Sequence, residues 1–225
     1  MLSQLVIREL CITSTPIAFI HEFVRRTRAA GAVTKFVLTA CAATWEEVDK
    51  LGEVLVRMRS TRRLLAVLLL ITDNLDQVQQ SDRPLWTRMN LSRCSVLETL
   101  NLTIYNKDPA YILPLLAAYL AAVMSAPSSL RMLNIFLVAL PQSYDPPFAP
   151  AYMRAFWDER DEMVVKHCPR RMTVNLDLVP MPASSAQTTE AEREVFKTFI
   201  TKHCLPRSVK QGRLRVLEDS ETTGT

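Results

Sequence analysis

Two histidine–cysteine pairs, His167-Cys168 and His203-Cys204, are the residues of this sequence best suited to chemistry. Cysteine and histidine are the usual zinc ligands, so together the four residues could form a zinc site. Zinc sites normally use CxxC or HxxxH spacing, because two ligands must converge from one turn, whereas adjacent residues point in different directions. The favoured interpretation is structural, with each histidine at a helix end and each cysteine packed inward. We therefore expect no metal and no cofactor.

Nucleophilic catalysis is a second interpretation, with Cys168 and His203 as a nucleophile–base pair. No local motif supports it. The four glycines, Gly31, Gly52, Gly212 and Gly224, lie too far apart for the glycine motifs that bind phosphates or expose a nucleophilic serine. We therefore expect that the protein is not an enzyme. The alternative interpretation is an enzyme built on a doubly wound sheet.

Two further segments suggest other partners. The arginine cluster in residues 57–63 could contact phosphates, but no aromatic side chain for base stacking is interspersed with it, and the net charge is only +4. Residues 109–130 carry no charge and are long enough to span a bilayer, but Pro114 and Pro127 interrupt them and a strand pattern follows directly. Nucleic-acid binding and membrane association are therefore the weaker interpretations.

The five cysteines point to a reducing compartment. Their number is odd, no pair has CxxC spacing, and the N-terminus shows no signal peptide. We expect free thiols and a cytoplasmic or nuclear protein.

An internal repeat is the strongest signal in the chain. Apolar residues recur at the spacing L-x-x-L-x-L, and successive segments start 26 to 41 residues apart. The segments are Ile7-Leu10-Ile12, Val33-Phe36-Leu38, Leu64-Val67-Leu69, Leu97-Leu100-Leu102 and Leu130-Leu133-Ile135, with a weaker one at Arg171-Val174-Leu176 and a remnant at Leu214-Leu217. Each segment predicts a strand.

Helical patterns follow most of these strands. Helices are predicted over residues 16–30, 44–59, 109–126, 150–167 and 189–203, and a less regular one over 83–93. Acidic residues gather at several helix starts and basic residues at several helix ends, which suits the helix dipole. Alternating strands and helices predict a parallel sheet with right-handed crossovers.

Most strands alternate apolar and polar residues, which predicts one wet sheet face and one face packed on helices. The segment from Leu64 to Ile71 is the exception, because it is apolar on both sides. We chose the candidate partner-binding residues by their predicted direction on the wet face: Glu9, Lys35, Glu98, Asn101, Arg131, Asn134, Asn175 and Asp177. The loops at 73–81 and 141–150 are predicted to extend this surface.

The stretch from Leu97 to Leu140 resembles the leucine-rich repeats that follow the F-box in fungal F-box proteins, and the resemblance covers roughly residues 5 to 180. It implies a right-handed solenoid, or horseshoe, with about six parallel strands on the concave side and helices on the convex side. It also implies the substrate-recognition part of a ubiquitin-ligase adaptor.

The chain departs from the pattern in two ways. No F-box is recognisable, and the usual repeat asparagine is replaced by Thr15, Cys41, Thr72, Tyr105 and Val138.

The sequence therefore predicts a single α/β solenoid over residues 1–217 and a disordered tail over 218–225. Its expected function is to bind a protein partner, without a small-molecule substrate. The identity of that partner is not encoded in any motif.

Overall fold

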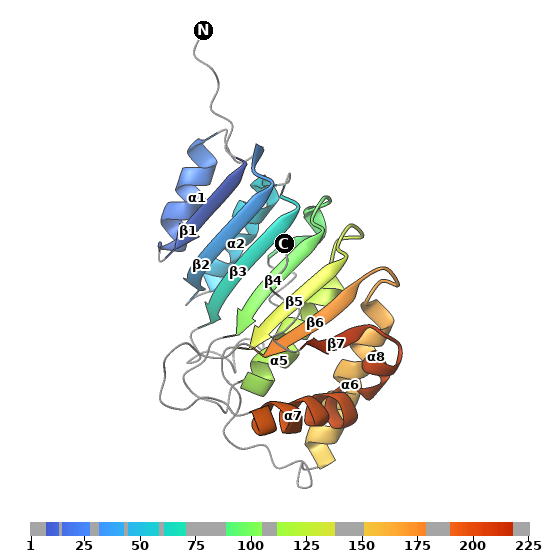
Figure 1. Ribbon diagram of the computed structural model, residues 1–225. Helices are drawn as coiled ribbons and strands as arrows, with labels where there is room; N and C mark the ends of the chain where they lie inside the picture. The colour runs from blue at the N-terminus through green and yellow to red at the C-terminus, as the bar shows by residue number, and fades with distance from the viewer. Residues whose placement is uncertain are drawn as a thin grey trace. The chain divides into compact units, whose positions relative to one another are not determined.

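The protein has a mixed α/β fold with parallel β-sheets (Figure 1). It divides into two compact units. In the computed structural model, the described residues are 8–13, 15–27, 32–42, 45–58, 61–70, 89–104, 112–137, 151–178 and 190–217. Unit 1 comprises Met1–Leu102 and Ser125–Arg131, and unit 2 comprises Thr103–Met124 and Met132–Thr225.

Unit 1 alternates strands and helices. Its elements are β1 (Glu9–Thr13), α1 (Ile17–Arg26), β2 (Lys35–Ala42), α2 (Trp45–Arg57), β3 (Arg63–Leu70), the 3-10 turn η3 (Leu91–Arg93) and the start of β4 (Thr99–Ile104). The strands pair in parallel and in chain order. The register aligns the repeat residues Leu10, Phe36, Leu64 and Leu100 in one row across the sheet.

The core of unit 1 lies between the sheet and the two helices that cover it. Figure 1 shows α1 and α2 together behind β1, β2 and β3. The buried side chains come from both layers and include Ile20, Val24, Phe36, Leu38, Leu51, Val54, Leu55, Leu100 and Leu102. Burying each such side chain stabilises the fold by about 1.5–3 kcal/mol before entropy is counted, so the apolar row dictates which sheet face the helices cover.

Hydroxyl side chains connect successive repeats of unit 1. Thr61 Oγ1, which is buried, donates a hydrogen bond to the carbonyl oxygen of Val33 (3.2 Å). Ser129 Oγ donates to the carbonyl oxygen of Leu97 (2.8 Å) in the same manner. Each hydroxyl precedes a strand and satisfies a backbone acceptor of the previous repeat, which would otherwise be left unpaired near the core.

Unit 2 continues the alternation. Its elements are α5 (Ile112–Leu120) with the 3-10 continuation η5 (Ala121–Ser125), β5 (Met132–Leu137), α6 (Ala151–His167), β6 (Thr173–Leu178), α7 (Glu190–Phe199) with a π-helical continuation η7 (Ile200–Cys204), α8 (Pro206–Lys210) and β7 (Leu214–Leu217). Strands β5, β6 and β7 pair in parallel and in chain order. The core joins Leu133, Ile135, Val174, Leu176 and Leu214 of the strands to Trp157, Val164, Phe196 and Ile200 of the helices.

Helix α8 is fixed at both ends. Asp161 of α6 is 1% exposed, and its carboxylate accepts hydrogen bonds from the backbone N–H groups of Arg207 (2.7 Å) and Ser208 (2.8 Å) and from Ser208 Oγ (2.5 Å). A distant side chain therefore caps the first turn of α8. At the other end Gly212 has a φ of 66°, and N–H groups of Gly212 and Arg213 bond Val209 and Ser208 carbonyls. This is the Schellman arrangement, which favours glycine.

The seven predicted strands are confirmed, including the remnant at Leu214–Leu217, but the assignment within the third segment is wrong. Leu64 pairs with Phe36 and Leu100, so Val67 and Leu69, which pair with Thr39 and Cys41, do not belong to the row of repeat residues. The helices at 16–30, 44–59, 150–167 and 189–203 are confirmed with shorter or locally altered ends, and 109–126 forms α5 and η5. The segment 83–93 shows only the 3-10 turn Leu91–Arg93 among its described residues. Helix α8 was not predicted. The loops 73–81 and 141–150 and the tail 218–225 lie outside the described residues.

The structure bears on two alternatives, the doubly wound sheet and a membrane-spanning segment. Within each unit the described strands follow chain order, without the reversal at which doubly wound sheets bind their ligands. No helix of the described residues, α5 included, combines the length and apolarity needed to cross a membrane. The solenoid curvature and the single 1–217 domain remain predictions.

We predict that Asp161→Ala lowers the free energy of unfolding by about 2–3 kcal/mol, because it leaves buried donors of α8 without an acceptor. Urea unfolding followed by circular dichroism measures this change. Asp158→Ala is the matched control, since Asp158 is an exposed carboxylate on the same helix, and its change is expected within about 0.5 kcal/mol. Equal effects of the two substitutions would contradict the capping role.

Candidate functional site

One face of each sheet carries the side chains that alternate with the buried repeat residues, and we call it the open face. Strand β5 shows the alternation clearly: Leu133, Ile135 and Leu137 are buried, whereas Asn134 and Phe136 are partly exposed. Strand β2 behaves likewise, with Lys35 exposed before the buried Phe36. Because side chains on a strand alternate between faces, burial of the repeat residues turns the intervening ones toward solvent.

A row of polar side chains crosses the open face of unit 2. Asn134 of β5 is in register with Asn175 of β6, and Asn175 is in register with Arg215 of β7. Asn175 Nδ2 donates a hydrogen bond to Asn134 Oδ1 (2.8 Å). The Oδ1 atom of Asn175 and the exposed guanidinium of Arg215 have no side-chain partner among the described residues. We call Asn134, Asn175 and Arg215 the amide row.

The amide row lies between neighbouring rows of mixed character. On β5 it is flanked by Met132, which is 40% exposed, and by the partly exposed Phe136. Thr173 is in register with Met132 and Asp177 with Phe136. The side chain of Asp177 lies outside the described residues, so only its strand position is established. Hydrogen-bonding groups thus sit beside exposed apolar groups, a combination common in protein interfaces.

The open face of unit 1 brings two of the predicted residues together. Glu9 of β1 and Lys35 of β2 are in register, and Lys35 Nζ lies 3.2 Å from Glu9 Oε2. Both side chains are largely exposed, so this ion pair contributes little to stability. Asn101 lies on β4 in register with Leu65 and is partly exposed.

Two predicted residues lie elsewhere than expected. Glu98 and Arg131 immediately precede β4 and β5, so they occupy the amino-terminal edge of the sheet and not its open face. Each lies two residues before a buried leucine and therefore has the orientation of that leucine, not that of the open face. Both are exposed, and the N–H of Arg131 donates to the carbonyl oxygen of Glu98 (2.9 Å).

Sequence reasoning missed Arg215. The signal was present, because Leu214 had been assigned to a remnant strand and the next residue must point to the opposite face. The missing information was that β7 pairs with β6 and extends its sheet, which places Arg215 beside Asn175.

The cysteines are poor candidates for chemistry. Cys94, Cys168 and Cys204 are buried, and burial raises the pKa of Cys94 to about 11 and raises that of Cys168 and Cys204 as well. The Sγ atoms of Cys94 and Cys168 lie near carbonyl oxygens of Leu55 (3.7 Å) and Met172 (3.5 Å). A thiol is nucleophilic or metal-binding as thiolate, which these surroundings disfavour.

The histidine–cysteine zinc site, the less favoured interpretation of these residues, does not assemble among the described residues. Among the described residues, no group of three or more His, Cys, Asp or Glu side chains is placed to hold a metal ion. His167 and His203 are exposed at helix ends, whereas Cys168 and Cys204 point into the core. The ring of His203 lies 6.3 Å from that of Phe199.

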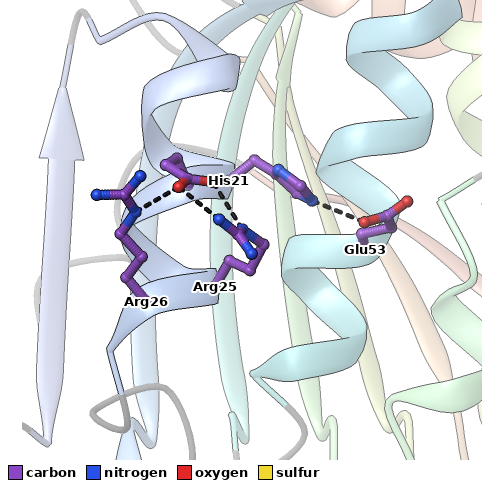
Figure 2. Close-up of polar contacts among 5 residues, drawn as sticks. His21, Arg25, Arg26 and Glu53 are labelled. Atoms are coloured by element: carbon purple, nitrogen blue, oxygen red, sulfur yellow. Dashed lines mark hydrogen bonds and ion pairs between the residues drawn. The ribbon is translucent and has the colours of Figure 1, made fainter.

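A polar cluster on the helices of unit 1 has a structural role. Figure 2 shows His21 Nε2 of α1 beside Glu53 Oε2 of α2, 2.7 Å away, which links the two helices. Arg25 and Arg26 both bond the carboxylate of Glu22. These hydrogen bonds, that from Arg25 above all, lower the pKa of Glu22 to about 2. These groups satisfy one another, so the cluster does not present a ligand site.

Comparison with known proteins identifies no relative: no protein-family model, no curated protein and no solved structure matches this chain.

We predict that, of the four cysteines whose side chains are described, only Cys11 reacts readily with iodoacetamide in the native protein. Cys11 is exposed, whereas burial shields the other three thiols and raises their pKa values. Mass spectrometry of tryptic peptides after brief labelling at mildly alkaline pH measures the modification of each site. Labelling in urea should modify all of them. Rapid native modification of Cys168 or Cys204 would revive the catalytic interpretation.

Proposed function

We propose that this protein is an interaction module that binds a protein partner through the open face of its sheets, with the amide row of unit 2 as the principal contact. The observation that carries the proposal is the in-register sequence Asn134, Asn175 and Arg215, held by the 2.8 Å amide–amide hydrogen bond. The row presents fixed polar groups at a strand spacing of about 4.8 Å.

The chemistry of the row suits a polypeptide ligand. A primary amide offers both a donor and an acceptor, so it can pair with a peptide group, which has the same combination. The Asn134–Asn175 bond holds the two amides in one orientation, which lowers the entropy cost of binding. Arg215 adds a planar cation that suits a carboxylate at one end of the row.

The surroundings of the row favour a protein partner in a second way. Met132 and Phe136 expose apolar surface on the same strand as Asn134. Methionine, phenylalanine and arginine are enriched in protein interfaces, where apolar contact supplies much of the affinity. The poor nucleophilicity of the buried cysteines favours binding over covalent catalysis.

We further propose the finer architecture, a leucine-rich-repeat solenoid whose open face is concave. The chain-order pairing within each unit, the burial of the repeat leucines and the hydroxyl links from Thr61 and Ser129 support it. On this view the chain is the recognition part of an F-box-type ubiquitin-ligase adaptor. The resemblance of residues 97–140 to such repeats is the basis for that assignment.

Site-specific photo-crosslinking tests the open face. We expect a photoreactive amino acid at Thr173, beside the amide row, to yield discrete adducts with a polypeptide in extracts of the source cells. The same probe at Thr198, an exposed position of α7 in the same unit, should not yield them. Combining the Thr173 probe with Asn175→Ala and Arg215→Gln should reduce the adducts about tenfold, whereas Lys166→Gln, a matched loss of one exposed charge, should not.

Two results would overturn this proposal. Adducts of equal yield from Thr173 and Thr198 would show that crosslinking does not depend on the open face. Adducts that persist in the Asn175→Ala and Arg215→Gln variant would show that the amide row does not contribute. Thermal unfolding of each variant checks folding. Because Arg215 is exposed and Asn175 is partly exposed, we expect shifts of only a few degrees.

A further inference from the structure

The amino-terminal edge of the unit 1 sheet carries an ordered ladder of residues, one from each repeat. Backbone N–H groups donate across it from Thr34 to Arg8 (2.8 Å), from Arg62 to Thr34 (2.9 Å), from Glu98 to Arg62 (2.8 Å) and from Arg131 to Glu98 (2.9 Å). We call Arg8, Thr34, Arg62, Glu98 and Arg131 the rim. Figure 1 shows the strands β1 to β4 beginning along one edge.

The three arginines of the rim are exposed, and their guanidinium groups have no partner among the described residues. Several other basic side chains of the unit are engaged, because Arg25 and Arg26 bond Glu22 and Lys35 pairs with Glu9. The ladder places an arginine on every second rung. Parallel strands are about 4.8 Å apart, so successive rim arginines start roughly 10 Å apart.

The rim is a net positive feature. Glu98 is its one acidic member, and the end of α2 lies close to it. Arg57 is in the last turn of α2, and the N–H of Thr61, the residue before Arg62, donates to the carbonyl oxygen of Met58 at the end of that helix (2.9 Å). A basic residue at a helix C-terminus suits the helix dipole, and here it adds charge to the same edge.

We propose that the rim binds an acidic segment of a protein in extended conformation, with its carboxylates on Arg8, Arg62 and Arg131. In the extended polyproline II conformation a chain advances about 3.1 Å per residue with three residues per turn, so acidic residues three positions apart point to the same side and lie roughly 9 Å apart, close to the spacing of the arginines. Guanidinium and carboxylate groups form strong paired hydrogen bonds.

An acidic peptide fits the rim better than a nucleic acid does. Single-stranded nucleic acids bind best where aromatic side chains stack on bases along a continuous basic groove. The rim contains no aromatic residue, and the carboxylate of Glu98 interrupts its positive charge. A peptide with acids at every third position can place neutral residues opposite Glu98, whereas a phosphate chain cannot leave such gaps.

Fluorescence anisotropy with labelled synthetic probes tests the rim. The probe is a peptide of repeated Glu-Gly-Ser units. Three other ligands are compared with it: a peptide of Gln-Gly-Ser repeats, a peptide of the same composition with its glutamates in one block, and oligo-dT. We expect the Glu-Gly-Ser repeat to bind most tightly. Raising NaCl from about 50 to 200 mM should weaken binding, since the contacts are exposed charges. The Gln-Gly-Ser repeat should not bind.

Substitutions locate the contacts. The combined Arg8→Gln, Arg62→Gln and Arg131→Gln variant should weaken binding about tenfold, whereas Arg154→Gln, an exposed arginine of unit 2, should leave it unchanged. Glu98→Gln should tighten binding about twofold to threefold, because it removes the repelling charge. A gain of affinity is informative because loss of folding cannot produce it.

Several outcomes would overturn the rim proposal. An equal loss of affinity in Arg154→Gln would indicate that the probe responds to overall charge. An unchanged affinity in Glu98→Gln would show that the probe does not bind at the rim. Tighter binding of oligo-dT, lost with the same arginines, would assign the rim to nucleic acid. The rim lies in unit 1 and the amide row in unit 2. Failure of the rim proposal therefore does not affect the crosslinking test at Thr173, and failure of that test does not affect the rim.

Discussion

The strict two-residue alternation of a β-strand governs the rest of this structure. Strands β2, β4, β5 and β6 each bury one apolar row, such as Leu100 and Leu102 of β4 or Leu133 and Ile135 of β5. Helices cover that row because its exposure to water would cost several kcal/mol per repeat. The row between the buried residues must then face outward, whatever its composition. The amide row is therefore a consequence of core formation, and the identity of its residues is not constrained by the core.

Much of the fold follows from this alternation, and so does much of the candidate site. The leucine spacing locates all seven strands, and it orients Lys35, Asn134 and Asn175 correctly. Which of the outward residues become neighbours depends on strand pairing, which alternation does not specify. The hydrogen bond between Asn134 and Asn175, which are 41 positions apart, required the register of β5 and β6.

Two features were beyond sequence reasoning for different reasons. Helix α8 is only five residues long and owes its capping to Asp161, which is 46 and 47 positions from its partners. No local pattern encodes so distant a contact, and an acidic residue within an amphipathic helix is normally expected at the surface. Glu98 and Arg131 lie at the sheet edge and not on its open face for another reason, the exact start of each strand. Strand β4 begins at Thr99 and β5 at Met132, one residue after each of them.

The rim also has a physical origin in the repeat. In a parallel strand–helix–strand unit, each helix ends on the side where the next strand begins. Basic residues favoured at helix ends, such as Arg57, therefore collect at the amino-terminal edge of the sheet. The arginines that precede the strands add to the same edge, and the backbone ladder fixes their spacing. A stabilising preference of single helices thus becomes, through repetition, a surface with charge and periodicity suited to an extended acidic ligand.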